Sequence, residues 1–283
     1  MSGKTHRLQI GDITCIVLHE GPSTSSPTQQ TPEGVLQRYP NAAASEISDD
    51  LQTHGYAQPA SMNALYIATA GTRILVDTGM GDRAKPALGH IPAALAAEGI
   101  SVEDIDIVFI THFHGDHIFG LLNEDGTPRY ANSRTITTQT EWDAWMSEDS
   151  LNAMPEDRAA DLQNTMAPLK DSFDYLHAGD TLAPGVFLVD MAGHTLGHTG
   201  LLIESNGERL FAVVDLLHSL PQFKYPHWHF AFDTDGDLAE QNRKAVLARA
   251  ADENLLTLFY HLPFPGLGHV TRQADGTFAF QAM

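Results

Sequence analysis

Histidines and one aspartate crowd a single short stretch of this sequence. His112, His114, Asp116 and His117 lie within six residues, directly after an apolar run. Imidazole and carboxylate groups are typical ligands of zinc and similar divalent metals. In an extended backbone His112 and His114 point to the same side, and a bend at Gly115 turns the next two ligands toward a second point. This spacing predicts two metal ions close together rather than a histidine-rich surface turn.

Three distant positions supply further candidate ligands, each at the end of an expected strand or in the turn beyond it. His194 and His198 belong to the turn Gly-His-Thr-Leu-Gly-His, whose glycines we expect to let the backbone approach a metal. Asp215 ends an apolar run, where a buried carboxylate is costly unless it is paired or metal-bound. His261 follows another apolar run. Spacing alone does not choose between His194 and His198.

This donor set predicts hydrolytic chemistry. It offers only nitrogen and oxygen ligands, which suit two Zn²⁺ ions or other divalent transition metals. Two cations that share a water lower its pKa toward neutrality, so the expected nucleophile is a metal-bridging hydroxide that attacks a carbonyl carbon or a phosphorus. Asp116 and Asp215 are the expected catalytic carboxylates, and Asp215 would carry the proton to the leaving group. Cys15, the one cysteine, lies far from this cluster in the chain.

Alternating strands and helices are expected to position these residues. Residues 1–283 are expected to form one domain, with a loop excursion over 21–60 that serves as a pocket or interface element and holds at most a short helix near 34–39. The patterns of apolar residues and turn residues indicate the other elements. These are strands over 8–18, 64–70, 72–77, 105–110, 185–190, 201–204, 210–214 and 255–260, with helices over 86–98, 141–170 (broken at Pro155) and 237–251.

The two halves of the chain follow a similar order, in which hairpin strands, a helix and an apolar strand lead to a histidine. This order favours an α/β (α+β) fold of two β-sheets between helices. At 42% hydrophobic residues, the 283-residue chain can fill a large core. The N-terminus lacks the apolar run of a secretory signal, and no stretch is apolar enough to span a membrane. We therefore expect a cytoplasmic protein without a membrane partner.

The charge balance argues against nucleic acid as a partner. The chain has 36 acidic and 16 basic residues, a formal net charge of −20. Proteins that bind nucleic acids take much of their affinity from basic contacts to phosphates. Lys224 and Arg243 are the nearest basic residues in the C-terminal half, and neither adjoins a candidate ligand. We therefore expect a small neutral substrate, and we leave homodimer formation open.

Weaker candidates surround the ligands in the sequence. Asp77, His198 and His269 are expected to orient ligands from behind, as metal ligands usually require, or else to make ordinary turn hydrogen bonds. His218 and Trp228 are expected to line the pocket, with ordinary packing as the alternative.

The set of motifs resembles that of the metallo-β-lactamase-fold hydrolases, from about residue 61 to the end of the chain. The matching residues are His112-x-His114-x-Asp116-His117, Gly193-His194-Thr195, Asp215 and His261. The resemblance implies an αββα sandwich of two mixed β-sheets with the metals at one edge. It also selects His194 over His198. The implied ligands are His112, His114 and His194 for one metal, Asp116, His117 and His261 for the other, and Asp215 as the bridge.

Differences between this sequence and several branches of the family leave fewer branches that it resembles. The flavodiiron branch carries Glu where this chain has His114, and the β-lactamases generally lack an aspartate like Asp215. The basic elements of glyoxalase II and of transfer-RNA-processing members have no counterpart. Residues 232–235 and 261–269 resemble the branch of methyl parathion hydrolase and related lactone and aryl-ester hydrolases. The pocket tyrosine of acyl-homoserine lactonases is not matched, since residues 216–218 are Leu-Leu-His.

The expected function is therefore a dinuclear-metal hydrolase that opens lactones or cleaves aryl and carboxylic esters. The main alternative is an organophosphate triesterase, because a triester is also uncharged. An acyl-homoserine lactonase, a β-lactamase or a phosphodiesterase is a weaker alternative. We expect neutral lactones or aryl esters to react faster than charged phosphodiesters.

Overall fold

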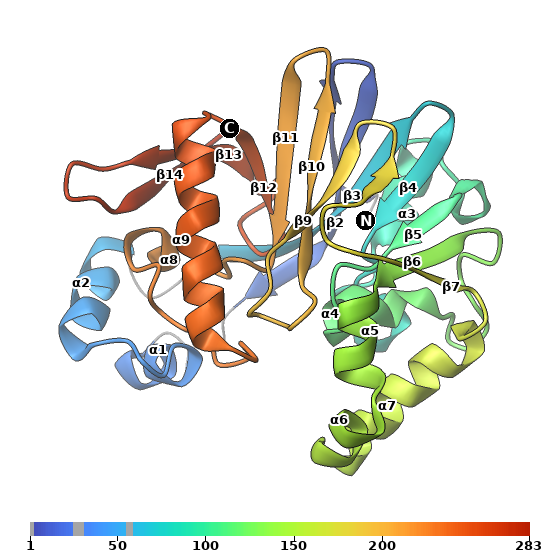
Figure 1. Ribbon diagram of the computed structural model, residues 1–283, viewed down its shortest axis with the longest axis horizontal. Helices are drawn as coiled ribbons and strands as arrows, with labels where there is room; N and C mark the ends of the chain where they lie inside the picture. The colour runs from blue at the N-terminus through green and yellow to red at the C-terminus, as the bar shows by residue number, and fades with distance from the viewer. Residues whose placement is uncertain (1–2, 25–30, 55–58) are drawn as a thin grey trace.

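The computed structural model describes residues 3–24, 31–54 and 59–283. Within them, two seven-stranded mixed sheets stand at the centre, with helices against their outer faces (Figure 1). One sheet has the strand order β1-β2-β3-β4-β5-β6-β7, and the other has the order β14-β13-β12-β11-β10-β9-β8. Each sheet is therefore built from one contiguous half of the chain. This confirms the expected sandwich of two mixed sheets, whereas the assignment of residues 1–283 to one domain stays a prediction.

The strands of the first half precede those of the second without mixing. The first sheet comprises β1 (Thr5–Ile10), β2 (Ile13–Thr24), β3 (Pro59–Thr69), β4 (Thr72–Val76), β5 (Ile107–Phe109), β6 (Arg134–Thr138) and β7 (Phe173–Leu176). The second comprises β8 (Thr181–Ala183), β9 (Val186–Asp190), β10 (Thr199–Ser205), β11 (Glu208–Val214), β12 (Leu256–Phe259), β13 (Leu267–Arg272) and β14 (Phe278–Ala282). β4 pairs with β5, and β11 with β12, in parallel.

Helices fill the connections between strands. The α-helices are α1 (Pro32–Arg38), α2 (Ala44–His54), α3 (Ile91–Ala97), α4 (Gly115–Ile118), α5 (Gln139–Met146), α6 (Glu148–Ala153), α7 (Glu156–Met166), α8 (Pro221–Lys224) and α9 (Gly236–Asp252). Short 3₁₀ turns are η2 (Gly81–Ala84), η3 (Val102–Asp104), η4 (Phe119–Leu121) and η5 (Ala167–Leu169). In Figure 1, α1 and α2 lie at the same end of the sandwich as α6 and α7. No helix of the described ranges has the length and apolar character to cross a membrane.

Strict alternation of apolar side chains explains why the sheets stack. Along β4, Ile74 and Val76 join the core between the two sheets, while Leu75 packs under the outer helices of the first sheet. Along β11, Leu210 points inward and Phe211 packs toward α9. Successive strand residues face opposite sides, so a strand that is apolar at every position is buried on both. Such strands place their C-terminal ends at one edge, where the loops carry the polar residues.

Several elements differ from the sequence prediction. The single strand expected over 8–18 is the hairpin β1–β2, because Gly11 adopts a φ of +55° that supports a tight turn. The helix expected over 86–98 begins only at Ile91, and the region 141–170 holds three helices instead of two. Within the excursion 21–60, α1 matches the expected short helix and α2 is additional. Residues 25–30 and 55–58 of the excursion lie outside the described ranges.

Candidate functional site

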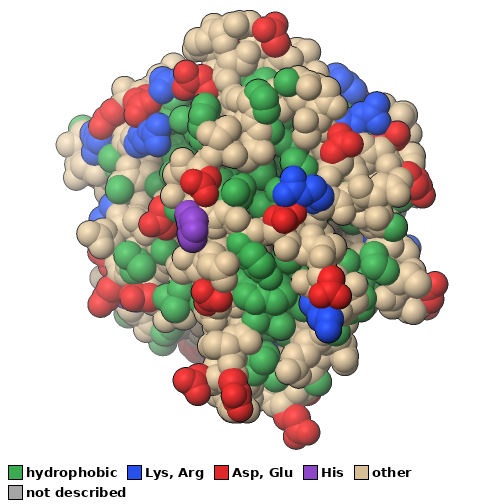
Figure 2. Space-filling model, turned by 45° about the vertical axis from the view of Figure 1, so that its right-hand side comes forward, with side chains coloured by type: hydrophobic (Ala, Val, Ile, Leu, Met, Phe, Trp, Pro, Cys, Tyr) green, Lys and Arg blue, Asp and Glu red, His purple; other side chains and the backbone are tan. Residues whose placement is uncertain are grey.

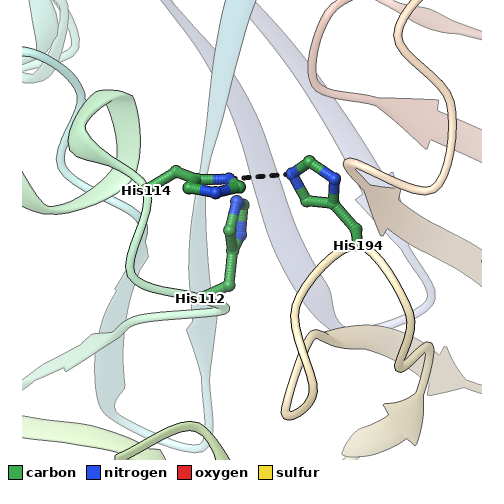
Figure 3. A group of neighbouring side chains, drawn as sticks. All are labelled: His112, His114 and His194. Atoms are coloured by element: carbon green, nitrogen blue, oxygen red, sulfur yellow. Dashed lines mark hydrogen bonds between the residues drawn. The ribbon is translucent and has the colours of Figure 1, made fainter. Parts of the chain in front are cut away.

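Three histidine rings meet where loops from the two sheets approach each other. His112 and His114 lie in the loop after β5, and His194 lies in the β9–β10 loop, so their side chains approach from opposite halves (Figure 3). His114 Nδ1 and His194 Nε2 are 2.9 Å apart. The three residues offer ligand atoms that all lie within 4.8 Å of one another. This geometry suits one cation held by three imidazoles.

Asp215 extends this group into a second one. It follows β11 directly, and its carboxylate lies 3.4 Å from His117 Nε2 and 2.9 Å from His261 Nε2. His112 Nε2 is 3.8 Å from Asp215 Oδ2, so Asp215 stands between the groups. Asp116, His117 and His261 also form a compact set of ligand atoms. The structure thus brings together all seven residues predicted to bind metal, and the assignment of each to a metal stays a prediction.

Left-handed backbone at two equivalent strand ends directs the polar residues. Asp77, directly after β4, has a φ of +61°, and Val214, the last residue of β11, has a φ of +48°. A β-branched residue in this region is a genuine outlier that costs about 1–3 kcal/mol. At Val214 the chain leaves the sheet abruptly, which directs the carboxylate of Asp215 toward the histidines. Such strain is commonly stored where a site must be positioned.

Two buried carboxylates hold ligand histidines from behind. Asp77 Oδ2 lies 2.8 Å from His117 Nδ1, and the same carboxylate accepts bonds from the backbone and hydroxyl of Thr111. Asp233 Oδ1 lies 2.9 Å from His194 Nδ1. Such contacts fix which ring nitrogen faces a metal and make that nitrogen more basic. This contact agrees with the expectation that Asp77 orients a ligand, whereas no such role was expected for Asp233.

A buried arginine anchors the second of these carboxylates. Arg243 of α9 is 1% exposed, and its guanidinium lies 3.3 Å from Asp233 Oδ2. It also donates to the backbone oxygens of Leu216, Pro226 and Trp228. Arg243 therefore fixes Asp233 and the loop between β11 and α9 together.

Glu141, in the first turn of α5, connects the two ligand loops. Its carboxylate accepts bonds from the backbone N–H of Phe113, from the Thr195 hydroxyl and from the backbone N–H of Gly197, at 2.8, 2.7 and 3.0 Å. Glu141 is completely buried, and burial raises its pKa to about 7. Sequence reasoning missed it, although Thr138 three residues earlier is the N-cap of the helix and marks its first turn.

The glycines of the His194 turn serve packing rather than approach to a metal. A Cβ on Gly193 would lie 2.2 Å from the backbone nitrogen of Ala239 in α9, and one on Gly197 would lie 2.2 Å from that of Glu141. Gly193 also has a φ of +129°. The expectation that these glycines bring the backbone near a metal is therefore wrong, because helices occupy the space beside them.

Electrostatics separates the histidines into two kinds. Burial lowers the pKa of His112, His114 and His194 well below the ordinary value, so these rings are neutral, as metal ligands must be. Burial also lowers the pKa of His117, but the carboxylates around it, Asp215 foremost, raise it well above the ordinary value. Burial raises the pKa of Asp215, but the nearby imidazoles hold it well below its usual range. Positive charge is therefore strongly favoured beside Asp215.

The hydrogen-bonding pattern fits a bound cation. His112 Nε2, His117 Nε2 and Asp215 Oδ1 are buried, and they have no hydrogen-bond partner in the described part of the chain. A buried polar atom without a partner costs about 1–3 kcal/mol. Each of these residues belongs to a group whose ligand atoms converge. A divalent cation satisfies these atoms and supplies the positive charge that Asp215 favours.

The converging ligands form the floor of an open cavity of about 350 Å³. Its walls are mainly apolar and include Met62, Phe230 and Phe232. Arg38 and Arg158 also line it. The expectation that no basic residue stands near the ligands is therefore wrong: α1 and α7, distant in the sequence, bring these arginines to the cavity.

Two of the weaker candidates, His218 and His198, lie next to Asp215. His218 lines the cavity, with its Nε2 3.2 Å from Asp215 Oδ2 and its ring stacked on Phe230. His198 Nδ1 donates to Met191 O, and its Nε2 accepts the backbone N–H of Asp215, so it supports Asp215 from behind.

The structure places the other two weaker candidates away from the cavity. Trp228 is fully buried beside Tyr39 and Tyr225, and its indole N–H donates to Glu46. His269 lies within β13, opposite Leu256 of β12. Trp228 therefore fits the alternative of ordinary packing.

The face of the molecule in Figure 2 has no large cluster of basic side chains. Basic side chains there stand mostly beside acidic ones, and apolar side chains gather along the middle of the face. Ion pairs such as Arg134–Asp174 and Arg272–Asp252 account for this pattern in the chain as a whole.

Solved structures of known hydrolases have the same architecture. The structure of AidC, a dizinc quorum-quenching lactonase in complex with the product N-hexanoyl-L-homoserine, superimposes with a TM-score of 0.89 at 28% identity, covering 100% of this chain and 98% of that one. The hydrolase AbOPH of the beta lactamase superfamily gives a TM-score of 0.86 at 24% identity, with 100% and 98% covered.

A curated relative matches a shorter region. The exodeoxyribonuclease WalJ of Streptococcus pneumoniae (serotype 2, strain D39) is 35% identical over 82 residues, which make up 28% of this chain and 28% of WalJ. The model of the metallo-beta-lactamase superfamily matches residues 58–261, most of the chain. With ligand groups supplied by loops of both sheets, the chain belongs to the metallo-β-lactamase superfamily and is a metal-dependent hydrolase.

Proposed function

We propose that this protein hydrolyses lactones or carboxylic esters with two zinc ions bound at the floor of the cavity. The observation that carries the proposal is the convergence of His112, His114 and His194 beside Asp215, below walls that include Phe230. AidC, described as a dizinc lactonase, supports the choice of metal and bond because its similarity extends over the whole chain.

Different residues would bind each of the two ions. His112, His114 and His194 would hold one ion, and Asp116, His117 and His261 the other, with Asp215 between them. Divalent cations supply Lewis-acid chemistry, which polarises an acyl oxygen and makes water acidic near neutral pH.

Hydrolysis adds one water across the acyl C–O bond and yields a carboxylic acid and an alcohol. Asp215 lies against the ligand histidines at the cavity floor, so its carboxylate can carry the proton from water to the leaving oxygen. Phe230 and Phe232 provide an apolar wall that displaces bulk water from the acyl group. An uncharged phosphotriester fits the same cavity and remains the alternative substrate class.

A hydrolysis panel tests the proposal. The zinc-loaded protein would be given a γ-lactone, an aryl ester, a phosphotriester, bis-nitrophenyl phosphate and a β-lactam, each with and without a chelator. We expect the lactone or the aryl ester to have the highest kcat/KM, and the chelator to abolish turnover. A preference for the phosphodiester that persists at high salt would contradict the proposal. A faster triester would favour the alternative.

A further inference from the structure

The cavity has a basic rim above its metal-binding floor. Arg38, at the C-terminal end of α1, and Arg158, in α7, both line it. The lining also includes the apolar side chains Met62, Phe230 and Phe232. A molecule in this cavity can therefore contact metal ligands, apolar side chains and guanidinium groups.

Among the residues that the structure describes, these two arginines differ from most basic residues because neither forms an ion pair. Most of the 16 basic residues form ion pairs with carboxylates, as Arg83 does with Asp161 and Arg249 with Glu253. Neither Arg38 nor Arg158 has a side-chain hydrogen bond or an ion pair among the residues that the structure describes. In a chain with a formal charge of −20, two unpaired guanidinium groups at one cavity leave a local preference for an anion.

The backbone or side chain of each arginine is held in place. The Arg38 carbonyl accepts a hydrogen bond from Ala231 N–H at 2.8 Å, which ties the end of α1 to the loop of Phe230 and Phe232. The Arg158 guanidinium stacks on the ring of Trp145, 5.8 Å from its centroid. Trp145 in turn contacts the ring of His114 at 5.4 Å. Both arginines are thus connected to residues of the cavity wall or floor.

We propose that the natural substrate is a small ester or lactone that carries a carboxylate at the end away from the scissile bond. Arg38 and Arg158 bind that carboxylate, because a guanidinium matches the planar carboxylate with paired hydrogen bonds. The apolar wall at Phe230 contacts the connecting chain. This inference rests on the proposed esterase or lactonase function, and it replaces the expectation of a neutral substrate.

A carboxylate is compatible with the acidic surface. Charges on the exposed surface are screened beyond about 8 Å at physiological salt, so a small monoanion is repelled only weakly on approach. A polyanion would meet many acidic groups at once and gains nothing comparable from two arginines. The basic rim therefore selects a small acid rather than a nucleic acid.

Two esters of equal chain length test the inference. The hydrolysis of 4-nitrophenyl hydrogen adipate, which ends in a carboxylate, would be compared with that of 4-nitrophenyl hexanoate, after subtraction of spontaneous hydrolysis. We expect the zinc-loaded protein to prefer the adipate ester. In Arg38→Gln and Arg158→Gln the ratio of kcat/KM between the two esters should fall by about 10- to 100-fold, mainly through KM, as for loss of a charge-assisted hydrogen bond.

Matched variants make the outcome decisive. Lys170 is also basic, exposed and without an ion pair among the described residues, but it does not line the cavity. Lys170→Gln should leave the ratio unchanged, and Arg158→Lys should retain part of the preference. Equal rates for both esters, with a ratio unaffected by either glutamine variant, overturn the inference while the esterase function stands. Failure to hydrolyse either ester or any lactone overturns the proposed function and this inference with it.

Discussion

Replacement of Glu141 by glutamine should loosen the metal site without touching a ligand. The carboxylate accepts a hydrogen bond on Oε1 from Phe113 and two on Oε2 from Thr195 and Gly197. An amide presents one oxygen and one NH₂ group. In the less costly orientation the oxygen keeps the bonds from Thr195 and Gly197, and the NH₂ group faces the Phe113 N–H. The Phe113 N–H then has no acceptor, and the new NH₂ group adds a second buried donor group that faces no acceptor.

The structure sets the size of the effect. One buried unsatisfied donor costs about 1–3 kcal/mol, so Glu141→Gln should lower the free energy of unfolding by at least that amount. Glu141→Ala removes all three acceptor contacts and should lower it by about 3 kcal/mol or more. Phe113 lies between two predicted ligands, His112 and His114, so both variants should also shift the ligand loop. Loss of such outer contacts typically weakens metal affinity by about 10- to 100-fold.

Two assays and one control test this reasoning. Urea unfolding of the metal-free protein gives the stability, and competition with a chelating dye gives the zinc affinity. Asp143→Asn is the control, because Asp143 is an exposed carboxylate of the same helix. The reasoning is refuted if Glu141→Gln matches the control both in unfolding free energy and in zinc affinity.

Other perturbations have equally definite outcomes. His114→Ala and Asp215→Ala should each lose zinc and activity together, and elemental analysis that finds full metal content in either variant would contradict the ligand assignment. His218→Ala should change the preference among substrates in a kinetic panel while metal content stays constant; release of metal would instead make His218 a ligand. Burial raises the pKa of Glu20 from about 4.5 to about 7, so the stability that its carboxyl contributes is present at low pH and is lost as the pH rises through 7. The stability advantage of the natural chain over Glu20→Gln in urea unfolding should therefore shrink by up to about 3 kcal/mol between about pH 5 and about pH 8, and an advantage that grows with pH would contradict this sign.

The metal ligands could be predicted because each one is marked by its neighbours in the sequence. His112 and His114 follow a buried strand directly, and Asp215 and His261 follow strands of the other half. Strands that end at one edge of a sandwich bring such residues together, so position relative to a strand end was sufficient. The type of fold followed from the same alternation of strands and helices.

Elements with weak apolar patterns could not be found in this way. β6 has the sequence Arg-Thr-Ile-Thr-Thr, which relies on the β propensity of threonine rather than on an apolar run. β13 and β14 were missed for a similar reason, since polar residues interrupt both. Edge and outer strands of a sheet need fewer apolar residues than central ones.

The missed site residues depend on tertiary contacts. Glu141 has the sequence context of an ordinary first-turn helix residue, and only the approach of two loops reveals its role. Arg38 and Arg158 lie on helices far from every motif. Trp228 shows the opposite case: it was expected to line the pocket, with ordinary packing as the alternative, and it is buried away from the cavity.

The separation of the two sheets along the chain has a consequence for assembly. The first sheet ends with β7 at Leu176 and the second begins with β8 at Thr181, so residues 177–180 join two complete halves. The first half contributes His114 and its neighbours, and the second contributes Asp215. A cation held by both halves binds only when they have docked, so its measured affinity includes the free energy of docking. After a cut within this connection, the apolar core shared by both sheets would still join the two polypeptides, and zinc would strengthen their association.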